Sequence, residues 1–261
     1  LDGEALSPEM CQHLQKLTPA GVILQVENLQ DPHQARAFVQ EIEGCAAQVQ
    51  PLPLLVTLAH EGATVNRFKR GITAFPSALA QGATGDPAVA YQLAEISGRE
   101  LAYSGFNMVL GPVADVLRNP DNRVLEVRTF GSDPARVSQF VAEAVRGYNA
   151  AGLIPVLKHY PGHGGVGEDS HDMLPIDNAS PAEFEQLYLP PFASGVAAGA
   201  PVIMTSHIAF PQISGNEMPT TLSPELLSDL RARLGFQGVI LSDAMAMKAI
   251  SGKAYSIERA S

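Results

Sequence analysis

The chain has 261 residues, 46% of them hydrophobic, and a formal net charge of −10 at pH 7. This length suffices for one domain with a sizeable core, and the negative charge disfavours nucleic acid, so we expect no nucleic-acid partner. No stretch reaches the roughly 20 consecutive apolar residues of a membrane helix, and the opening LDGEALSPEM lacks the basic and apolar regions of a signal peptide. We therefore expect a soluble protein without a membrane partner.

The chain contains two cysteines, Cys11 and Cys45, and both fall on segments that we expect to be helical. Cysteine use of this kind is more typical of a reducing compartment than of a disulfide framework. We therefore expect two unpaired helix residues and a cytoplasmic protein.

Short apolar runs alternate with amphipathic stretches along the chain, which is the pattern of a parallel sheet with crossover helices. The predicted strands are 22–26, 54–58, 108–113, 154–159, 202–206 and 239–242. The predicted helices between them are 34–49, 87–103, 134–150, 181–198 and 224–234. The sequence shows no repeat, low-complexity tract or linker, so we expect a single α/β domain over 1–261.

Each predicted helix begins at or near an Asp or Ser followed by proline. An oxygen-bearing cap residue accepts a hydrogen bond from a free N–H of the first turn, and proline presets the first helical φ. These helix-start signals are Asp31-Pro32, Asp86-Pro87, Asp133-Pro134, Ser180-Pro181 and Ser223-Pro224.

Polar side chains concentrate directly after the predicted strands. Because the carboxyl ends of parallel strands share one edge, these side chains should form a rim suited to a hydroxyl-rich small molecule. For Glu61 and His207 taken singly, an ordinary loop role stays open. The rim residues are His60, Glu61, Asp115, Arg128, Lys158, His159, His207 and Asp243.

The stretch KHYPGHGGVGEDSHD at 158–172 carries the strongest signal. It holds three histidines, one lysine, three acidic residues and five glycines or prolines, so it cannot form a regular helix. It follows the apolar run LIPVL, so the charged cluster emerges where a buried strand ends.

The segments KHYPGHGGVGEDSHDMLP (158–175) and GVILSDAMAM (238–247) resemble the signatures of glycoside hydrolase family 3, in its β-N-acetylglucosaminidase branch. GVILQVEN (21–28), RTFGSDP (128–134) and VIMTSHIAFP (202–211) add to the resemblance. It implies a TIM-type (β/α)8 barrel that removes terminal β-linked N-acetylglucosamine with retention of configuration. The chemistry implied needs no metal or cofactor, and the implied partner is a small amino-sugar glycoside.

The resemblance also implies residue roles. Asp243 matches the nucleophile that forms a covalent glycosyl-enzyme, and His171 matches the acid/base. Asp169, two residues earlier, would orient the imidazole of His171. Lys158, His159 and Arg128 match positions that bind sugar hydroxyls, and His207 joins them in our prediction as a strand-end residue.

Three alternatives stay open. His159, His163, His171 and Asp169 are acceptable zinc ligands for a loop-built metal hydrolase. The same site could use phosphate as acceptor, since a neutral histidine repels phosphate less than a carboxylate does. The third alternative is a non-catalytic sugar-binding relative.

The third alternative rests on residues 59–65, where the sequence differs from the family pattern. The family segment runs D-Q-E-G-G-R-V, whereas this chain has AHEGATV, with Ala59 in place of a sugar-binding Asp. Losing that charge-assisted hydrogen bond would cost about 1.5–3 kcal/mol of binding free energy.

The resemblance aligns the six predicted strands with the second to seventh strands of the barrel. We therefore expect the first and eighth strands outside the chain, which would be a fragment of a longer polypeptide, completed by another segment or a further domain. The sequence does not identify the aglycone, which could come from a cell-wall muropeptide, a chitin oligosaccharide or another glycoconjugate.

Overall fold

Six parallel strands form one curled sheet in the computed structural model, which describes residue 1 and residues 3–252. Each strand pairs with the next one along the chain, as in a TIM-type barrel. The strands are β1 (Gly21–Ile23), β2 (Leu55–Leu58), β3 (Met108–Val109), β4 (Ile154–Tyr160), β5 (Val202–Thr205) and β6 (Val239–Ser242).

All six predicted strands are therefore confirmed, although several are shorter than predicted. The predicted strand 108–113 ends at Val109. Pro112 lies in its second half and has no N–H to donate to a neighbouring strand. Beyond it, Val113 pairs with Lys158 as an isolated bridge.

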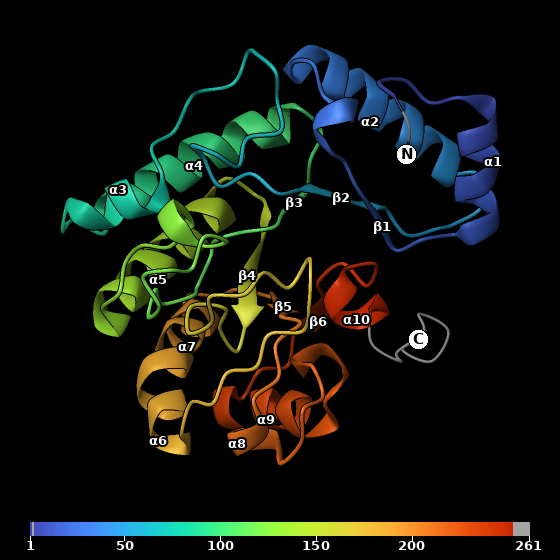
Figure 1. The fold of residues 1–261 in the computed structure, drawn as a ribbon. Helices are drawn as coiled ribbons and strands as arrows, with labels where there is room; N and C mark the ends of the chain where they lie inside the picture. The colour runs from blue at the N-terminus through green and yellow to red at the C-terminus, as the bar shows by residue number, and fades with distance from the viewer. Residues whose placement is uncertain (2, 253–261) are drawn as a thin grey trace.

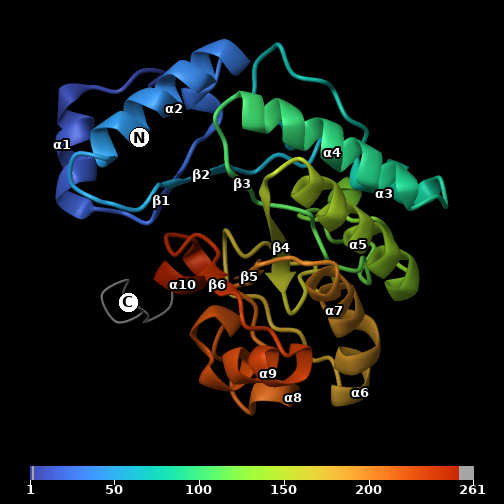
Figure 2. The same ribbon diagram turned by 180° about the vertical axis from the view of Figure 1, so that it is seen from behind.

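The longer helices lie on the outer side of the curled sheet, as the two opposite views show (Figures 1 and 2). None of the helices in residues 3–252 is long and apolar enough to cross a membrane. The helices are α1 (Pro8–Leu17), α2 (Pro32–Ala46), α3 (Ala78–Ala83), α4 (Ala88–Tyr103), α5 (Pro134–Ala150), α6 (Pro181–Glu183), α7 (Leu189–Ala197), α8 (Pro211–Ser214), α9 (Pro224–Leu234) and α10 (Lys248–Ser251).

The five predicted helices are confirmed, with one interruption. A π-helical segment, Phe184–Tyr188, separates α6 from α7 within the predicted helix 181–198. The side chains of Asp31, Asp133, Ser180 and Ser223 accept hydrogen bonds from first-turn N–H groups, as predicted. Short helices such as α3 were not predicted from the sequence.

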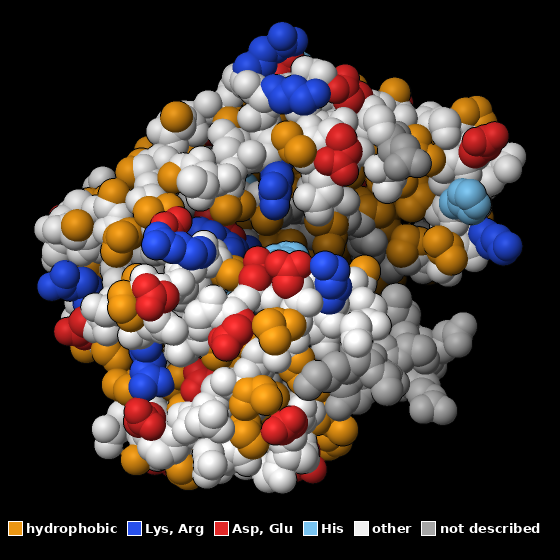
Figure 3. Space-filling view, in the orientation of Figure 1, with side chains coloured by type: hydrophobic (Ala, Val, Ile, Leu, Met, Phe, Trp, Pro, Cys, Tyr) orange, Lys and Arg blue, Asp and Glu red, His pale blue; other side chains and the backbone are white. Residues whose placement is uncertain are grey.

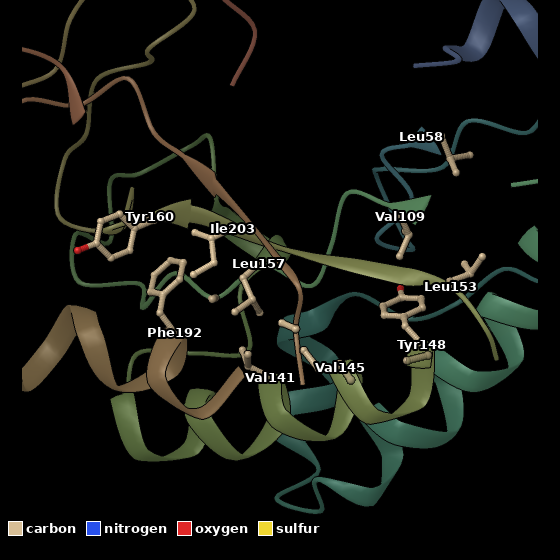
Figure 4. Packing of buried hydrophobic residues seen from close by; sticks show 14 of the residues in the cluster. Leu58, Val109, Val141, Val145, Tyr148, Leu153, Leu157, Tyr160, Phe192 and Ile203 are labelled. Atoms are coloured by element: carbon tan, nitrogen blue, oxygen red, sulfur yellow. The ribbon is translucent and has the colours of Figure 1, made fainter. Parts of the chain in front are cut away.

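The outer face of the sheet packs on α5 and α7 (Figure 4). Leu157 of β4 and Ile203 of β5 are fully buried against Val141, Val145 and Phe192. Gly195 of α7 permits this approach, because a Cβ there would lie 2.6 Å from Leu157 Cδ1.

The inner face carries a separate apolar cluster, made of Met108, Leu110, Val156, Val202 and Met204. Successive side chains of a strand point to opposite faces. Lys158 therefore points inward like Val156, whereas Leu157 points to the helices. This alternation therefore places the side chain of Lys158 on the inner face of the sheet, next to the apolar cluster.

The expectation of unpaired cysteines is wrong. Cys11 of α1 and Cys45 of α2 form a disulfide, with their Cα atoms 5.8 Å apart. The two helices pack against each other, so residues separated by 34 positions become neighbours. The disulfide also removes the argument for a reducing compartment that rested on cysteine use.

We expect the Cys11→Ala/Cys45→Ala double variant to lose about 2–4 kcal/mol in free energy of unfolding, because the crosslink restricts the unfolded chain. Urea unfolding of both proteins would measure the loss. A reductant should lower the midpoint of the parent protein and leave that of the double variant unchanged. Equal midpoints for the parent with and without reductant would contradict the pairing.

Candidate active site

A cleft with a cavity volume of about 490 Å³ opens at the carboxyl ends of the strands. This volume suits a small ligand such as one or two sugar rings. Its floor is apolar and consists of Ala59, Leu110, Met204 and Leu241. Figure 3 shows basic, acidic and histidine side chains gathered around the hollow. The polar lining comprises Glu61, Arg67, Arg128, Lys158, His159, His163, Ser170, His171 and Asp243.

Glu61 is the anionic centre of one wall. Lys158 Nζ lies 2.6 Å from Glu61 Oε1, and Arg128 binds both carboxylate oxygens through Nε and Nη2 at 2.8 Å each. Burial raises the pKa of Glu61, but the charges of Lys158 and Arg128 outweigh it and hold that pKa well below its ordinary value. Glu61 therefore stays ionised and fixes both cations at the cleft.

Asp115 orients His159 from behind the cleft. Its Oδ2 accepts from His159 Nδ1 at 2.8 Å, and its Oδ1 accepts from the backbone N–H of His163 at 2.6 Å. Burial raises the pKa of Asp115, whereas His159 and His163 lower it, and the net shift is downward. The carboxylate is therefore ionised and can only accept, so Nδ1 of His159 carries the hydrogen.

His163 ties together the two ends of the glycine-rich loop. Its Nε2 lies 3.1 Å from Ser170 Oγ, and burial lowers its pKa, so the ring is neutral. Asn122 holds the loop by donating to the carbonyls of His163 and Val166 at 2.8 Å each. A Cβ at Gly164 would lie 1.7 Å from the Val116 carbonyl oxygen, which explains a glycine there.

His171 and Asp169 form the local pair that the D-S-H spacing predicts. Asp169 Oδ1 accepts from His171 Nδ1 at 2.7 Å and from its backbone N–H at 2.8 Å. Burial raises the pKa of Asp169, but these two hydrogen bonds and the nearby His171 and His163 together lower it further than burial raises it. The His171 side chain is 64% exposed, so its Nε2 remains accessible to a ligand.

Asp243 follows β6 and lines the same cleft as His171. The backbone N–H of Ala244 donates to its Oδ1 at 2.8 Å. Burial raises the pKa of Asp243, but the nearby His159, this N–H, His207 and Lys158 together lower it below its ordinary value. Asp243 is therefore an ionised carboxylate at neutral pH.

The segments that carry His171 and Asp243 contact each other directly. Lys248 and Ala249, at the start of α10, donate backbone hydrogen bonds to the carbonyls of His171 and Ser170 at 3.3 and 3.2 Å. The turn after Asp243 leads straight into α10. The position of one segment therefore constrains the position of the other.

Two strand-end histidines lie outside the cleft lining. His207 is 1% exposed, and its Nδ1 and Nε2 lie 2.9 Å from Thr221 Oγ1 and 3.1 Å from the Ala244 carbonyl oxygen. Both ring nitrogens are therefore occupied, and His207 positions the residue after Asp243. The prediction that His60 reaches the rim is wrong, because His60 is 1% exposed and lines a separate small cavity with Ser97 and Tyr148 instead of the cleft.

Sequence reasoning missed Arg67 and Ser170 as lining residues and placed Asp115 on the rim instead of behind His159. Arg67 reaches the cleft because Gly62 and Val65 pair in a tight antiparallel turn. The sequence GATVN (62–66) contains turn-forming residues and could have predicted this turn.

The ligands of the metal alternative are engaged separately. His159 pairs with Asp115, His163 with Ser170, and His171 with Asp169. Among residues 3–252, no three His, Cys, Asp or Glu side chains are grouped in a way that could hold a metal ion.

Residues 5–261 match the family described as "Glycosyl hydrolase family 3 N terminal domain". The chain belongs to glycoside hydrolase family 3. A beta-hexosaminidase of Xylella fastidiosa (strain M23) is 36% identical to this family 3 domain over 257 residues, or 96% of this chain and 74% of the relative. A beta-hexosaminidase of Stenotrophomonas maltophilia (strain R551-3) is 36% identical over 95% of this chain and 73% of the relative.

Solved structures of family 3 enzymes share the fold. A β-N-acetylglucosaminidase from Paenibacillus sp. str. FPU-7 superposes with a TM-score of 0.95 at 36% identity, over 98% of this chain and 49% of that one. NagZ from Neisseria gonorrhoeae gives a TM-score of 0.90 at 29% identity, over 100% of this chain and 75% of that one. This family 3 domain thus spans about half the length of the Paenibacillus chain.

Replacing Glu61 should show how far the site depends on this carboxylate. We expect Glu61→Gln to lower the free energy of unfolding by about 3–5 kcal/mol, because it leaves the buried Lys158 and the partly buried Arg128 without their counter-charge. Glu126→Gln, which removes an exposed partner of Arg123, is the matched control and should change little. Chemical denaturation at pH 7 would measure both, and equal effects in the two variants would contradict the argument.

The same carboxylate gives the protein an acid-sensitive stability. Because the folded pKa of Glu61 lies below its ordinary value of 4.5, its contribution is complete above pH 4.5 and is lost as the pH falls through the folded pKa. The free energy of unfolding of the parent protein should therefore fall more steeply below pH 4.5 than that of Glu61→Gln.

Proposed function

We propose that this family 3 domain hydrolyses terminal β-linked N-acetylglucosaminides with retention of configuration, through a covalent intermediate on Asp243 and with His171 as the acid/base. The observation that carries the proposal is that an ionised carboxylate and an exposed, carboxylate-oriented imidazole line one cleft. A nucleophile and a proton donor at one sugar carbon are what retaining hydrolysis requires.

In the first step, a carboxylate oxygen of Asp243 attacks the anomeric carbon as the glycosidic bond breaks. The proton on Nε2 of His171 passes to the departing oxygen, so the aglycone leaves as an alcohol. Asp169 stabilises the imidazolium before transfer and keeps the Nδ1 hydrogen directed toward itself. The hydrogen bond from Ala244 leaves one Asp243 oxygen fixed and the other available for attack.

In the second step, a water molecule attacks the same carbon from the face that the aglycone left. His171 Nε2, now neutral, takes the proton of the water while the bond to Asp243 breaks. The free sugar leaves with its original configuration, and both side chains return to their starting states. The exposure of His171 favours this dual role, because aglycone and water must both reach its ring.

Lys158, His159 and Arg128 would hold the sugar hydroxyls. Glu61 fixes the two cations and Asp115 fixes the imidazole, so none of the three has to be ordered when substrate binds. Preorganised groups of this kind strengthen binding, because the substrate does not have to order them.

The amino-sugar specificity is supported by the relatives. Those at 36% identity are named beta-hexosaminidase, and a structure of NagZ from Neisseria gonorrhoeae is in complex with N-trifluoroacetyl-D-glucosamine. The proposed reaction involves only the side chains of the chain, the glycoside and water, and needs no cofactor.

A glycoside phosphorylase is the second candidate. A beta-glucoside phosphorylase superposes on this chain with a TM-score of 0.82 at 28% identity. In that reaction phosphate would replace water in the second step and release a sugar 1-phosphate. The neutral His163 and the cation Lys158 near the cleft do not oppose an anionic acceptor.

A screen of aryl β-glycosides that differ at the 2-position, with and without phosphate, would test both candidates. We expect turnover only of the 2-acetamido sugar, with free N-acetylglucosamine as product in both conditions. Asp243→Asn should reduce kcat to the blank rate, because an amide cannot form the glycosyl-enzyme. Sugar 1-phosphate as the main product would favour the phosphorylase, and unchanged turnover by Asp243→Asn would overturn the mechanism.

The role of His171 can be separated from general damage by varying the leaving group. We expect His171→Ala to slow alkyl glycosides by about 100-fold or more, and aryl glycosides with acidic phenols much less, because only poor leaving groups need the proton. His13→Ala, an exposed histidine on α1, is the matched control and should leave all rates unchanged. Equal slowing of good and poor leaving groups would show that His171 is not the acid.

A further inference from the structure

Arg67 is a cation in the cleft wall without a counter-charge. Its side chain lines the cleft, and its Nε is buried without a hydrogen-bond partner among the described residues. No hydrogen bond or ion pair links Arg67 to any other side chain within residues 3–252. A buried guanidinium N–H without a partner costs free energy, so an acceptor that binds there is favoured.

Glu61, the acidic residue nearest to Arg67 along the chain, cannot act as its counter-charge. Both oxygens of Glu61 bind Arg128, and one also binds Lys158. The floor offers only a methyl group at Ala59, two residues before Glu61. The lining of the cleft thus contains three cations, Arg67, Arg128 and Lys158, against two carboxylates, Glu61 and Asp243.

The position of Arg67 indicates which part of a substrate would meet it. Arg67 follows β2, whereas Asp243 follows β6, and three strands lie between them in the sheet. The aglycone would leave past His171, whose side chain is 64% exposed, whereas the Nε of Arg67 is buried, so a ligand group at Arg67 lies deep in the cleft and away from the bond that is cleaved. The group that Arg67 meets belongs to the sugar in the cleft and not to the aglycone.

We propose that Arg67 forms an anion subsite and that the preferred substrates carry a negatively charged oxyanion, a carboxylate or a sulfate, on the far end of the sugar that is released. The inference rests on the proposed glycosidase function and names its substrate class. A guanidinium binds such a group through two parallel hydrogen bonds, which a neutral hydroxymethyl group cannot make. The methyl group of Ala59 leaves no floor carboxylate to repel the anion.

The kinetic test compares three aryl β-glycosides: the N-acetylglucosaminide, its 6-sulfate and its 6-carboxylate. We expect kcat/KM for at least one charged substrate to be about tenfold or more higher than for the uncharged N-acetylglucosaminide. The charged substrate with the higher kcat/KM shows whether the site prefers sulfate or carboxylate. Arg67→Gln should reduce this ratio to about one, and Ala59→Asp should lower it by repulsion. Arg70→Gln, three residues on with a side chain 73% exposed, is the matched control and should keep the ratio.

The neutral glycoside as the best substrate, or an unchanged ratio in Arg67→Gln, would overturn the inference. A binding measurement by calorimetry separates this failure from failure of the proposed function, and uses N-acetylglucosamine, its 6-sulfate and inorganic sulfate. Tighter binding of the sulfated sugar than of either other probe, lost in Arg67→Gln, would support the subsite even without turnover of any glycoside. Equal affinity for the two sugars, or for sulfated sugar and free sulfate, would contradict it.

Discussion

The site depends on one buried carboxylate that two cations share. Glu61 lies between Lys158 from β4 and Arg128, and so joins three segments that are far apart in the sequence. Removing charges from water is expensive, and the arrangement is stable only because each charge has its partners in good geometry. The same arrangement explains the uneven charge of the cleft, since a carboxylate engaged by two cations is not available to Arg67.

The two proposed catalytic groups differ in setting, and the difference suits their tasks. Asp243 is half-buried, ionised and fixed by a backbone N–H, as a nucleophile that attacks from one direction should be. His171 lies at the exposed edge of the cleft and is held by its neighbour Asp169 and by contacts with α10. A group that serves both the aglycone and water needs that access. The backbone contacts with α10 keep the distance between the two groups defined despite the exposure of one of them.

Short-range physics made a large part of the molecule predictable. Alternating apolar runs gave all six strands, and the Asp-Pro and Ser-Pro signals marked the helix starts, because caps and strand periodicity act within a few residues. The pair of Asp169 and His171 was predictable for the same reason, since a two-residue spacing leaves little choice of partner.

Contacts between distant segments were decided by the tertiary structure alone. The sequence by itself determined the order of strands and helices, their caps and the composition of the glycine-rich loop. It did not determine that Cys11 meets Cys45, that His207 holds Ala244, that His60 turns to the helices or that Arg67 enters the cleft. Each of these depends on how separate elements pack, and packing is set by the whole core and not by any local stretch of residues.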